Sequence, residues 1–275
     1  MVLAVDIGNS NTRCALFERE ALAAHWSLPT DTGRDAAFYE QRLTEALADA
    51  RRAVQDVRHV IVGSVVPDVR GLSEAVRALF GGRVTWADPR MDFGFAVEYD
   101  DPSQVGIDRL AGGVAASHLY GVPVIVVDVG TAITVDMVTA DGRFVAGVIA
   151  PGMRLGAEAL HQGTGLLPGV EPGGQAPLVG RSTADCIRSG VFFSAVGLVD
   201  RVIAGLRSQV DPAAFAVATG GDAECIAQAC TCVQTVNPHL VLWGLYLLHQ
   251  RSGAGDRGPK PRAGGFRRVT PSAGP

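Results

Sequence analysis

The chain has 275 residues, 47% hydrophobic and 19% charged, enough for one large or two ordinary globular domains with a substantial core. No apolar run approaches the roughly 20 residues that span a bilayer, and the first residues lack the features of a secretory signal, so we expect a cytoplasmic protein with no membrane attachment. The formal net charge of −4 argues against a dedicated nucleic-acid-binding protein.

The lysine content excludes several kinds of phosphate chemistry. Lys260 is the only lysine, so the chain cannot build a Walker-type loop, a protein-kinase site or a Schiff base. Phosphate chemistry must instead rely on backbone amides, arginines and metal-bound aspartates. Five cysteines without a C-x-x-C pair argue against a disulfide framework or a zinc site, and we expect Cys14 to be buried in a strand.

The charge is unevenly distributed. From Arg251 onward there are six basic residues and one acid, so this segment carries +5 and leaves −9 for residues 1–250. Its glycine, proline and arginine content predicts a disordered, solvated basic tail at 251–275.

The first half of the chain alternates strands with helices. The predicted elements are strands at 2–6, 12–18 and 21–28, a helix from 36 to 54, a strand at 57–66, a helix at 68–80 that ends before two glycines, and a strand at 83–88. This order is typical of a mixed α/β domain.

The second half begins again with a strand meander. The predicted elements are a helix at 108–119, strands at 123–128, 131–138 and 143–149 with a hairpin turn at 141–142, one or two helices within 182–206, a strand at 215–221, and a closing helix at 237–250. We therefore predict an N-terminal domain at 1–117 and a C-terminal domain at 118–250.

Each half contains a strand that ends in an aspartate and a glycine turn. The stretch "LAVDIGNSNTRCALF" at 3–17 carries Asp6, and "VIVVDVGTAITVDMV" at 124–138 carries Asp128. Such a turn exposes backbone amides to a phosphate, and the adjacent carboxylate can hold Mg²⁺. Two such turns would bind a triphosphate from both sides. The alternative is two ordinary hairpin turns, each with a solvated aspartate.

The paired turns resemble the phosphate loops of the acetate kinase, sugar kinase, Hsp70 and actin superfamily. From Asp6 to about Leu248 the chain resembles the type III pantothenate kinases in particular. The matching stretches, in family order, are "DIGNSNTR", "EYDDPSQVGIDRLAG", "DVGTAITVD", "GVIAPGMRLGAEAL", "TGLLP", "GRSTADCIRSG" and "TGGDA". The chain departs from the family at Ser10, which replaces a usual threonine, and at Ala146, which replaces a usual glycine.

This resemblance implies a fold and a reaction. The fold is α/β, with two duplicated actin-like (ribonuclease H-like) domains that have mixed sheets and flanking helices, and with a nucleotide cleft between them. The reaction is ATP-dependent phosphorylation of pantothenate to 4′-phosphopantothenate, the first step of coenzyme A biosynthesis. Mg²⁺ and a monovalent cation, K⁺ or NH₄⁺, assist, and the enzyme is a homodimer.

The resemblance also implies site residues. The ATP-binding residues are Asp6, Ile7, Gly8, Asn9, Ser10, Asn11, Thr12, Arg13 and Thr131. The pantothenate-binding residues are Tyr99, Gly106, Ile107, Asp108, Arg109 and Thr183, with Asp108 as the catalytic base. Asp6 binds Mg²⁺ and Asp128 binds the monovalent cation, although a carboxylate alone does not distinguish K⁺ from Mg²⁺.

Several of these residues have structural alternatives. Asp108 suits a helix N-cap, and Arg109 could pair with Asp100 or Asp101. Tyr99 could be a partly buried strand aromatic. Thr183, expected to reach pantothenate across the dimer interface, could instead cap a helix together with Ser182.

Two other functions stay open at this point. One is a small-molecule kinase of the same superfamily that phosphorylates a sugar or a short acid. The other is a nucleotide-binding accessory protein of transcription, which only the basic tail favours. A pure binding module would not need a base in the acceptor site, so the three aspartates favour an enzyme.

Overall fold

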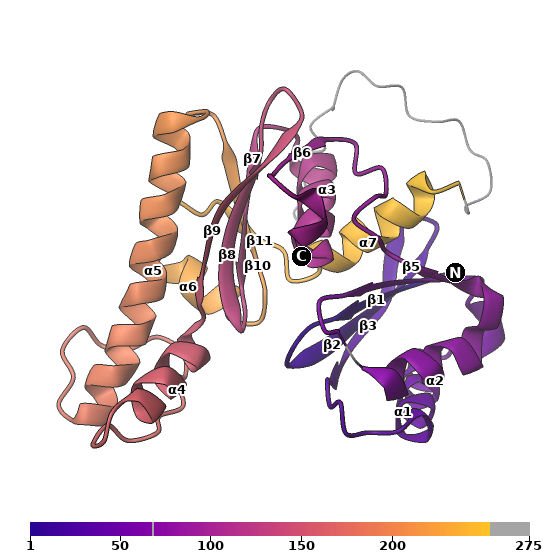
Figure 1. Ribbon diagram of the computed structural model, residues 1–275, viewed down its shortest axis with the longest axis horizontal. Coiled ribbons are helices and arrows are strands. Elements are labelled where there is room, and N and C mark those ends of the chain that lie inside the picture. The colour runs from indigo at the N-terminus through magenta and orange to yellow at the C-terminus, as the bar shows by residue number, and fades with distance from the viewer. Residues whose placement is uncertain (68, 254–275) are drawn as a thin grey trace. The chain divides into compact units, whose positions relative to one another are not determined.

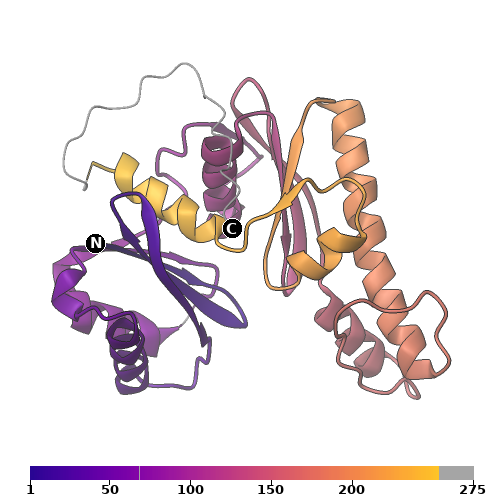
Figure 2. The ribbon, with the colours of Figure 1, turned by 180° about the vertical axis from the view of Figure 1, so that it is seen from behind.

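The computed structural model describes residues 1–67 and 69–253 (Figures 1 and 2). Packing divides them into two compact units. Unit 1 holds Met1–Gly94, Asp101–Ala115 and the described residues from His239, and unit 2 holds Phe95–Asp100 and Ala116–Pro238. The domain division near residue 118 stays a prediction, because units defined by packing need not coincide with duplicated halves. The basic tail predicted at 251–275 begins too early, because Arg251 ends the helix Leu240–Arg251, and from 254 onward it lies outside the described residues.

Unit 1 is built on a mixed five-stranded sheet. Its strands are β1 (Val2–Ile7), β2 (Asn11–Glu18), β3 (Ala21–Pro29), β4 (His59–Ser64) and β5 (Val84–Trp86), in the order β3-β2-β1-β4-β5. The first three strands form the predicted antiparallel meander, whereas β4 lies parallel to both β1 and β5. Strand β1, which ends at the first turn, is therefore the central strand.

Helices cover both faces of this sheet. They are α1 (Ala36–Asp49) and α2 (Arg70–Phe80) on one face, and α7 (Leu240–Arg251) on the other (Figure 2). Helix α1 buries Tyr39, Leu43 and Leu47, which lie on one face because they are four residues apart. On the other face, Phe17 stacks on Tyr246 of α7, with ring centroids 4.5 Å apart.

Two boundaries in unit 1 test the sequence predictions. The helix predicted to reach residue 54 is too long: α1 ends at Asp49, and Arg51 adopts a left-handed conformation with φ 55° that a helix cannot continue through. The predicted stop after α2 is confirmed, because Gly81 has φ 57°.

Unit 2 repeats this sheet with one strand added. Its strands are β6 (Ala96–Glu98), β7 (Val124–Val129), β8 (Ala132–Val138), β9 (Arg143–Pro151), β10 (Phe215–Thr219) and β11 (Thr235–Val236), in the order β6-β9-β8-β7-β10-β11. The strands β7 to β11 reproduce the order and the directions of β1 to β5. The predicted duplication of a mixed α/β domain is therefore confirmed.

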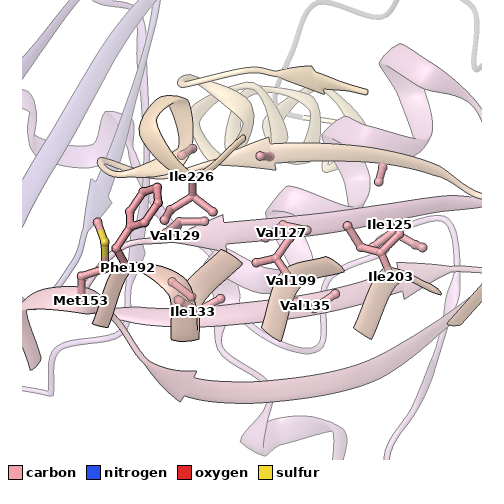
Figure 3. Close-up of a cluster of buried hydrophobic side chains, with 14 of the residues drawn as sticks. Ile125, Val127, Val129, Ile133, Val135, Met153, Phe192, Val199, Ile203 and Ile226 are labelled. Atoms are coloured by element: carbon pink, nitrogen blue, oxygen red, sulfur yellow. The ribbon is translucent and has the colours of Figure 1, made fainter. Parts of the chain in front are cut away.

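Three helices pack on one face of the unit 2 sheet: α4 (Met153–Gly163), α5 (Thr183–Gln209) and α6 (Ala223–Ala229). Figure 3 shows the resulting core, in which Val199 and Ile203 of α5 lie against Val127 and Ile125 of β7. The segment predicted as one or two helices is a single helix. Helices α4 and α6 and strands β6 and β11 were not predicted.

Helix α5 is the one helix in the described ranges that is long and apolar enough to cross a membrane. Seven of its 27 residues, including Val199 and Ile203, are buried, and these two lie in the unit 2 core.

Candidate active site

The first predicted phosphate turn joins β1 to β2 at the centre of the unit 1 sheet. The Gly8 amide donates to the Asn11 carbonyl at 3.1 Å, and a Cβ atom on Gly8 would lie 3.0 Å from that same oxygen. Asn9, Ser10 and Asn11 are exposed. The turn therefore has a tight closure that favours glycine and an exposed rim of small polar residues.

Asp6 lies at the start of this turn and is only 7% exposed. It pairs in register with Arg13 of β2 and with Gly63 of β4. Burial raises the pKa of the Cys14 thiol, and the nearby Asp6 carboxylate raises it further. The alternative of a solvated aspartate is therefore wrong for Asp6, which sits at the carboxyl end of a buried strand.

Asp108 lies in the first turn of α3 (Ile107–Tyr120). The amides of Arg109 and Leu110 donate to the Gly106 carbonyl at 3.1 and 3.2 Å, so Gly106 takes the N-cap place. The Asp108 carboxylate accepts from the Arg109 amide at 2.7 Å and lies 2.5 Å from where a Cβ on Gly106 would be. The N-cap alternative for Asp108 is therefore wrong.

The start of α3 lies at the same edge of the unit 1 sheet as the first turn. The Val65 amide, directly after β4, donates to the carbonyl of Ile7 at the end of β1 at 3.1 Å. A Cβ on Gly106 would lie 3.5 Å from the Val65 side chain. The structure thus brings the predicted "VGIDR" segment to the carboxyl ends of β1 and β4, where the first turn begins.

The second predicted turn joins β7 to β8 in unit 2 and is packed more tightly. The Gly130 amide donates to the Ala132 carbonyl at 3.0 Å, and the Gly152 amide donates to the Thr131 carbonyl at 2.9 Å. A Cβ on Gly152 would overlap the Gly130 carbonyl oxygen. Thr131 itself is exposed at the tip of the turn.

Asp128 is half-buried beside this turn. Gly220, with φ 102°, passes so close that a Cβ there would overlap both Asp128 Oδ1 and the Val129 carbonyl oxygen. The Asp222 amide donates to that carbonyl at 3.0 Å. Two oxygen atoms therefore converge at Gly220, a contact that the sequence reasoning missed, although "TGGDA" had been matched as a nucleotide-side turn.

Three predicted pantothenate residues lie outside the turns. Tyr99 follows β6 and is 41% exposed, so the alternative of a partly buried strand aromatic is wrong. The Ser182 hydroxyl accepts from the Asp185 amide at 3.1 Å and caps α5, which leaves Thr183 as an exposed first-turn residue. Arg109 is half-buried, and its ion-pair alternative stays open.

Within residues 1–67 and 69–253, no group of three or more His, Cys, Asp or Glu side chains is arranged to hold a metal ion. Kinases commonly hold Mg²⁺ through one or two carboxylates together with substrate phosphates, and a single carboxylate beside an exposed turn, as at Asp6, fits that mode. The Asp128 carboxylate is an oxygen ligand of the kind that such cations prefer, without deciding between K⁺ and Mg²⁺, whereas the Val129 carbonyl already accepts from the Asp222 amide.

Two comparisons with known proteins, one with family models and one with individual sequences, give the same family. Residues 2–205 match the family model described as type III pantothenate kinase. The chain is 38% identical over 255 residues to a type III pantothenate kinase of Acidiphilium cryptum, covering 92% of this chain and 96% of that protein.

Solved structures support the fold. The structure resembles that of a Baf family protein of Campylobacter jejuni that carries a provisional assignment as a transcriptional activator (TM-score 0.58, 20% identity, 92% of this chain and 99% of that one). It also resembles the activator of 2-hydroxyisocaproyl-CoA dehydratase of Clostridium difficile, solved with ADPNP (TM-score 0.52, 14% identity, 92% and 96% covered).

Proposed function

The chain belongs to the type III pantothenate kinases and phosphorylates pantothenate with ATP in coenzyme A biosynthesis, and from this premise we propose which of its residues bind each substrate. Asp6, Ile7, Gly8, Asn9, Ser10, Asn11, Thr12, Arg13 and Thr131 bind ATP. Tyr99, Gly106, Ile107, Arg109 and Thr183 bind pantothenate, and Asp108 is the catalytic base.

The ATP assignment rests on the construction of the two turns. Each follows a central strand whose penultimate residue is an aspartate, and each closes through a glycine amide. A glycine turn lets phosphate oxygens approach backbone amides without a Cβ in the way. A relative of the same fold was solved with the ATP analogue ADPNP, which supports nucleotide binding by this architecture.

Asp6 would hold Mg²⁺, and Asp128 would hold K⁺ or NH₄⁺. Bound there, these cations neutralise charge on the phosphates as the phosphoryl group is transferred. The buried position of Asp6 limits its carboxylate to a few orientations, which favours a fixed cation position. The half-buried position of Asp128 suits a cation that stays partly hydrated.

Asp108 would accept the proton from the primary hydroxyl of pantothenate. The hydroxyl oxygen then forms a bond to the γ-phosphorus, the bond from that phosphorus to the β–γ bridging oxygen breaks, and ADP leaves. Phosphoryl transfer depends mostly on positioning. The hydrogen bond from the Arg109 amide and the contact with Gly106 hold the Asp108 carboxylate in place, and this observation carries the assignment of the base.

We expect the enzyme to act as a cytoplasmic homodimer. Unit 2 exposes large apolar side chains on β9, α4 and α5, namely Ile149, Leu155, Leu160 and Phe193. A second copy that covers this surface would remove them from water, and Thr183 at the exposed start of α5 could then reach the partner's pantothenate. Sedimentation equilibrium tests the dimer.

Replacing Asp108 with Asn tests the proposed base. The Asp108→Asn enzyme should lose turnover by at least about a hundredfold, the typical range for removing a positioned acid–base group, while its dissociation constant for ATP stays within about twofold. The matched control is Asp49→Asn at the exposed end of α1, which should keep full turnover. Near-normal turnover of Asp108→Asn would remove this residue from the mechanism.

A further inference from the structure

We propose that Thr30 is a positioning residue for ATP: it holds the first turn in its binding conformation, and Tyr39 fixes Thr30 in turn. This inference rests on the proposed function of that turn in binding ATP. Neither residue belongs to a glycine turn or to a matched motif, so only the folded structure points to them.

Thr30 contacts the first turn through both its backbone and its side chain. Its amide donates to the Ser10 carbonyl at 3.1 Å. Its hydroxyl lies 2.9 Å from the hydroxyl of Thr12, which is fully buried. Thr30 therefore holds the exposed tip of the turn and its buried base at the same time.

The bond to the Ser10 carbonyl also sets the direction of a neighbouring amide. The peptide group is planar and trans, so its carbonyl and its N–H point in opposite directions. With the Ser10 carbonyl held toward Thr30, the Asn11 N–H points away from β3. Losing the hydroxyl contact with Thr12 would let Thr30 shift and weaken its bond to the Ser10 carbonyl. The peptide could then rotate, and the Asn11 amide, which we propose to face a phosphate, would lose its orientation.

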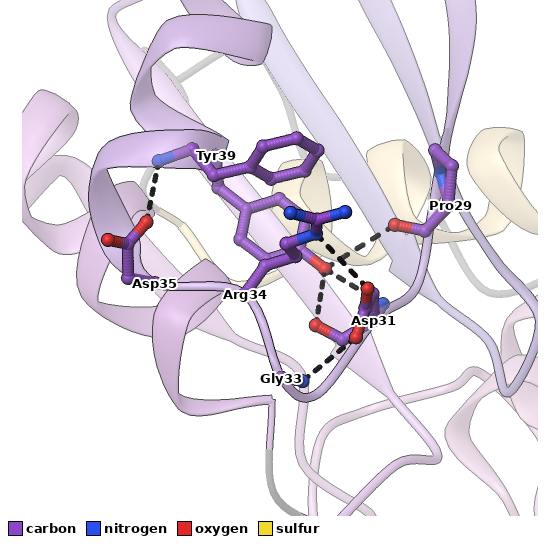
Figure 4. Close-up of polar contacts among 7 residues, drawn as sticks. Pro29, Asp31, Gly33, Arg34, Asp35 and Tyr39 are labelled. Atoms are coloured by element: carbon purple, nitrogen blue, oxygen red, sulfur yellow. Dashed lines mark hydrogen bonds and ion pairs between the residues drawn. The ribbon is translucent and has the colours of Figure 1, made fainter.

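Tyr39 fixes the residues on both sides of Thr30 (Figure 4). The Tyr39 hydroxyl accepts from the Asp31 amide at 2.9 Å and donates to the Asp31 carbonyl at 2.9 Å, with a longer contact of 3.4 Å to the Pro29 carbonyl. The Tyr39 side chain extends from α1 and is completely buried in the core of unit 1. Helix α1 thus holds Pro29 and Asp31 through the Tyr39 hydroxyl group.

The start of α1 is itself well anchored. The Asp35 carboxylate caps the helix by accepting from the Phe38 amide at 3.0 Å. The Asp31 carboxylate accepts from the Gly33 amide at 2.9 Å and from Arg34 Nε at 3.2 Å, closing the loop between β3 and α1 (Figure 4). The chain of contacts therefore runs from α1 through Asp31 and Thr30 to the first turn, all within unit 1.

The test compares substitutions that remove single hydroxyl groups. Thr30→Val keeps the shape and the amide but loses the hydroxyl, and Thr30→Ser restores the hydroxyl. We expect Thr30→Val to raise the dissociation constant and the KM for ATP about tenfold, near the worth of one hydrogen bond, with the KM for pantothenate within about twofold. Thr30→Ser should recover the parent values, and Tyr39→Phe should give a similar ATP-specific rise of about fivefold.

The matched control is Tyr246→Phe. Tyr246 is a buried tyrosine of the same unit whose hydroxyl lies near Glu20, in the β2–β3 turn at the opposite end of β2. The Tyr246→Phe variant should leave the KM values for ATP and for pantothenate unchanged. Thermal unfolding of each variant checks that it is folded, and Thr30→Val decides the matter if Tyr39→Phe does not fold.

Two results would overturn the inference: Thr30→Val binding ATP as the parent does, or raising both KM values alike. Asp6→Asn, measured in parallel, separates this failure from that of the proposed function. If Asp6→Asn weakens ATP binding and Thr30→Val does not, the positioning role alone is wrong. If neither variant weakens ATP binding, the assignment of the turn to ATP is wrong, and the inference falls with it.

Discussion

The two turns share one topology but are supported in different ways. In unit 1, hydroxyl groups and backbone hydrogen bonds from Thr30 support the first turn, and three of its residues are exposed. In unit 2, the Gly152 amide donates a comparable hydrogen bond to the Thr131 carbonyl, but the backbone of Gly152 and Gly220 also packs directly against the second turn. Asp6 is buried, whereas Asp128 is half-exposed between these close backbone contacts.

This difference shows that a duplicated strand–turn unit can keep its topology while its supporting contacts diverge. A turn held by hydroxyl groups should lose affinity gradually when one contact is removed. A turn that packs backbone against backbone has no space for an added atom, so a single added methyl group should displace it and cause a large loss of stability and activity. The predictions below test that contrast, beginning with the largest effect.

Gly152→Ala should be the most damaging single substitution in either turn. Its methyl group would overlap the Gly130 carbonyl oxygen and approach the Thr131 carbonyl oxygen, and backbone atoms cannot move aside as a side chain can. We expect the free energy of unfolding to fall by about 3 kcal/mol and turnover to fall by at least about a hundredfold, because the turn is displaced. Denaturant unfolding and a coupled kinase assay measure the two quantities.

The control is Gly205→Ala, a half-buried site within α5 where a Cβ meets no neighbour within 4 Å, on a different face of the helix from Phe193. Alanine favours a helix interior over glycine, so this variant should gain up to about 1 kcal/mol and keep its turnover. Comparable losses in both variants would mean that close packing at Gly152 is not what supports the second turn.

The sequence predicted the parts of the fold that local patterns determine. Alternating and continuous apolar runs located both meanders, and the glycine at position 81 located the end of α2. Helix α4 was missed because its stretch was considered only for its family match, although Met153, Ala157 and Leu160 recur at the spacing of one helix face. Strands β6 and β11 have three and two residues and depend on pairing with distant partners.

The candidate site shows the same limit. Asp6, Asp128 and Asp108 were found because each belongs to a short recognisable stretch. The contacts of Gly152, Gly220 and Thr30 with the turns join residues about 20 to 90 positions apart, and such contacts exist only once the sheets have formed. Nothing in the sequence near Thr30 signals its bond to Ser10.

The two aspartates should respond to different cations. Asp6→Asn should raise the Mg²⁺ concentration for half-maximal activity about tenfold, because a neutral amide is a poorer ligand than a carboxylate. Asp128→Asn should instead raise the K⁺ or NH₄⁺ concentration for half-maximal activity by a smaller factor, about fivefold, since Asp128 is half-exposed and water can supply part of the lost coordination. Activity titrated with each cation at a fixed level of the other measures both.

Asp49→Asn, the exposed control, should shift neither titration. If Asp128→Asn changed the Mg²⁺ requirement and left the monovalent requirement untouched, the two carboxylates would hold the same kind of cation. The proposed division between the turns would then be wrong.

The last effect that we predict concerns stability in acid and separates the units rather than the turns. His249 in α7 is 1% exposed, and neither ring nitrogen has a hydrogen-bond partner in the described part of the chain. Burial, followed by the nearby His59 ring 4.8 Å away, lowers the pKa of His249 from 6.5 to about 4. The unfolded chain therefore binds this proton first. The free energy of unfolding of unit 1 should therefore be highest above pH 6.5. It should decrease as the pH falls toward 4, by about 3 kcal/mol at most.

Hydrogen exchange measures this loss separately in each unit. Between pH 6.5 and 4, after correction for the intrinsic exchange rate, the amides of β1 and β4 should lose more protection than those of β7 and β10. His249→Leu should abolish that extra loss, because it removes both unpartnered nitrogens, whereas His161→Leu in α4 of unit 2 should preserve it. Equal acid sensitivity of the two units in the parent protein, or an unchanged loss in His249→Leu, would show that the buried ring does not control the acid stability of unit 1.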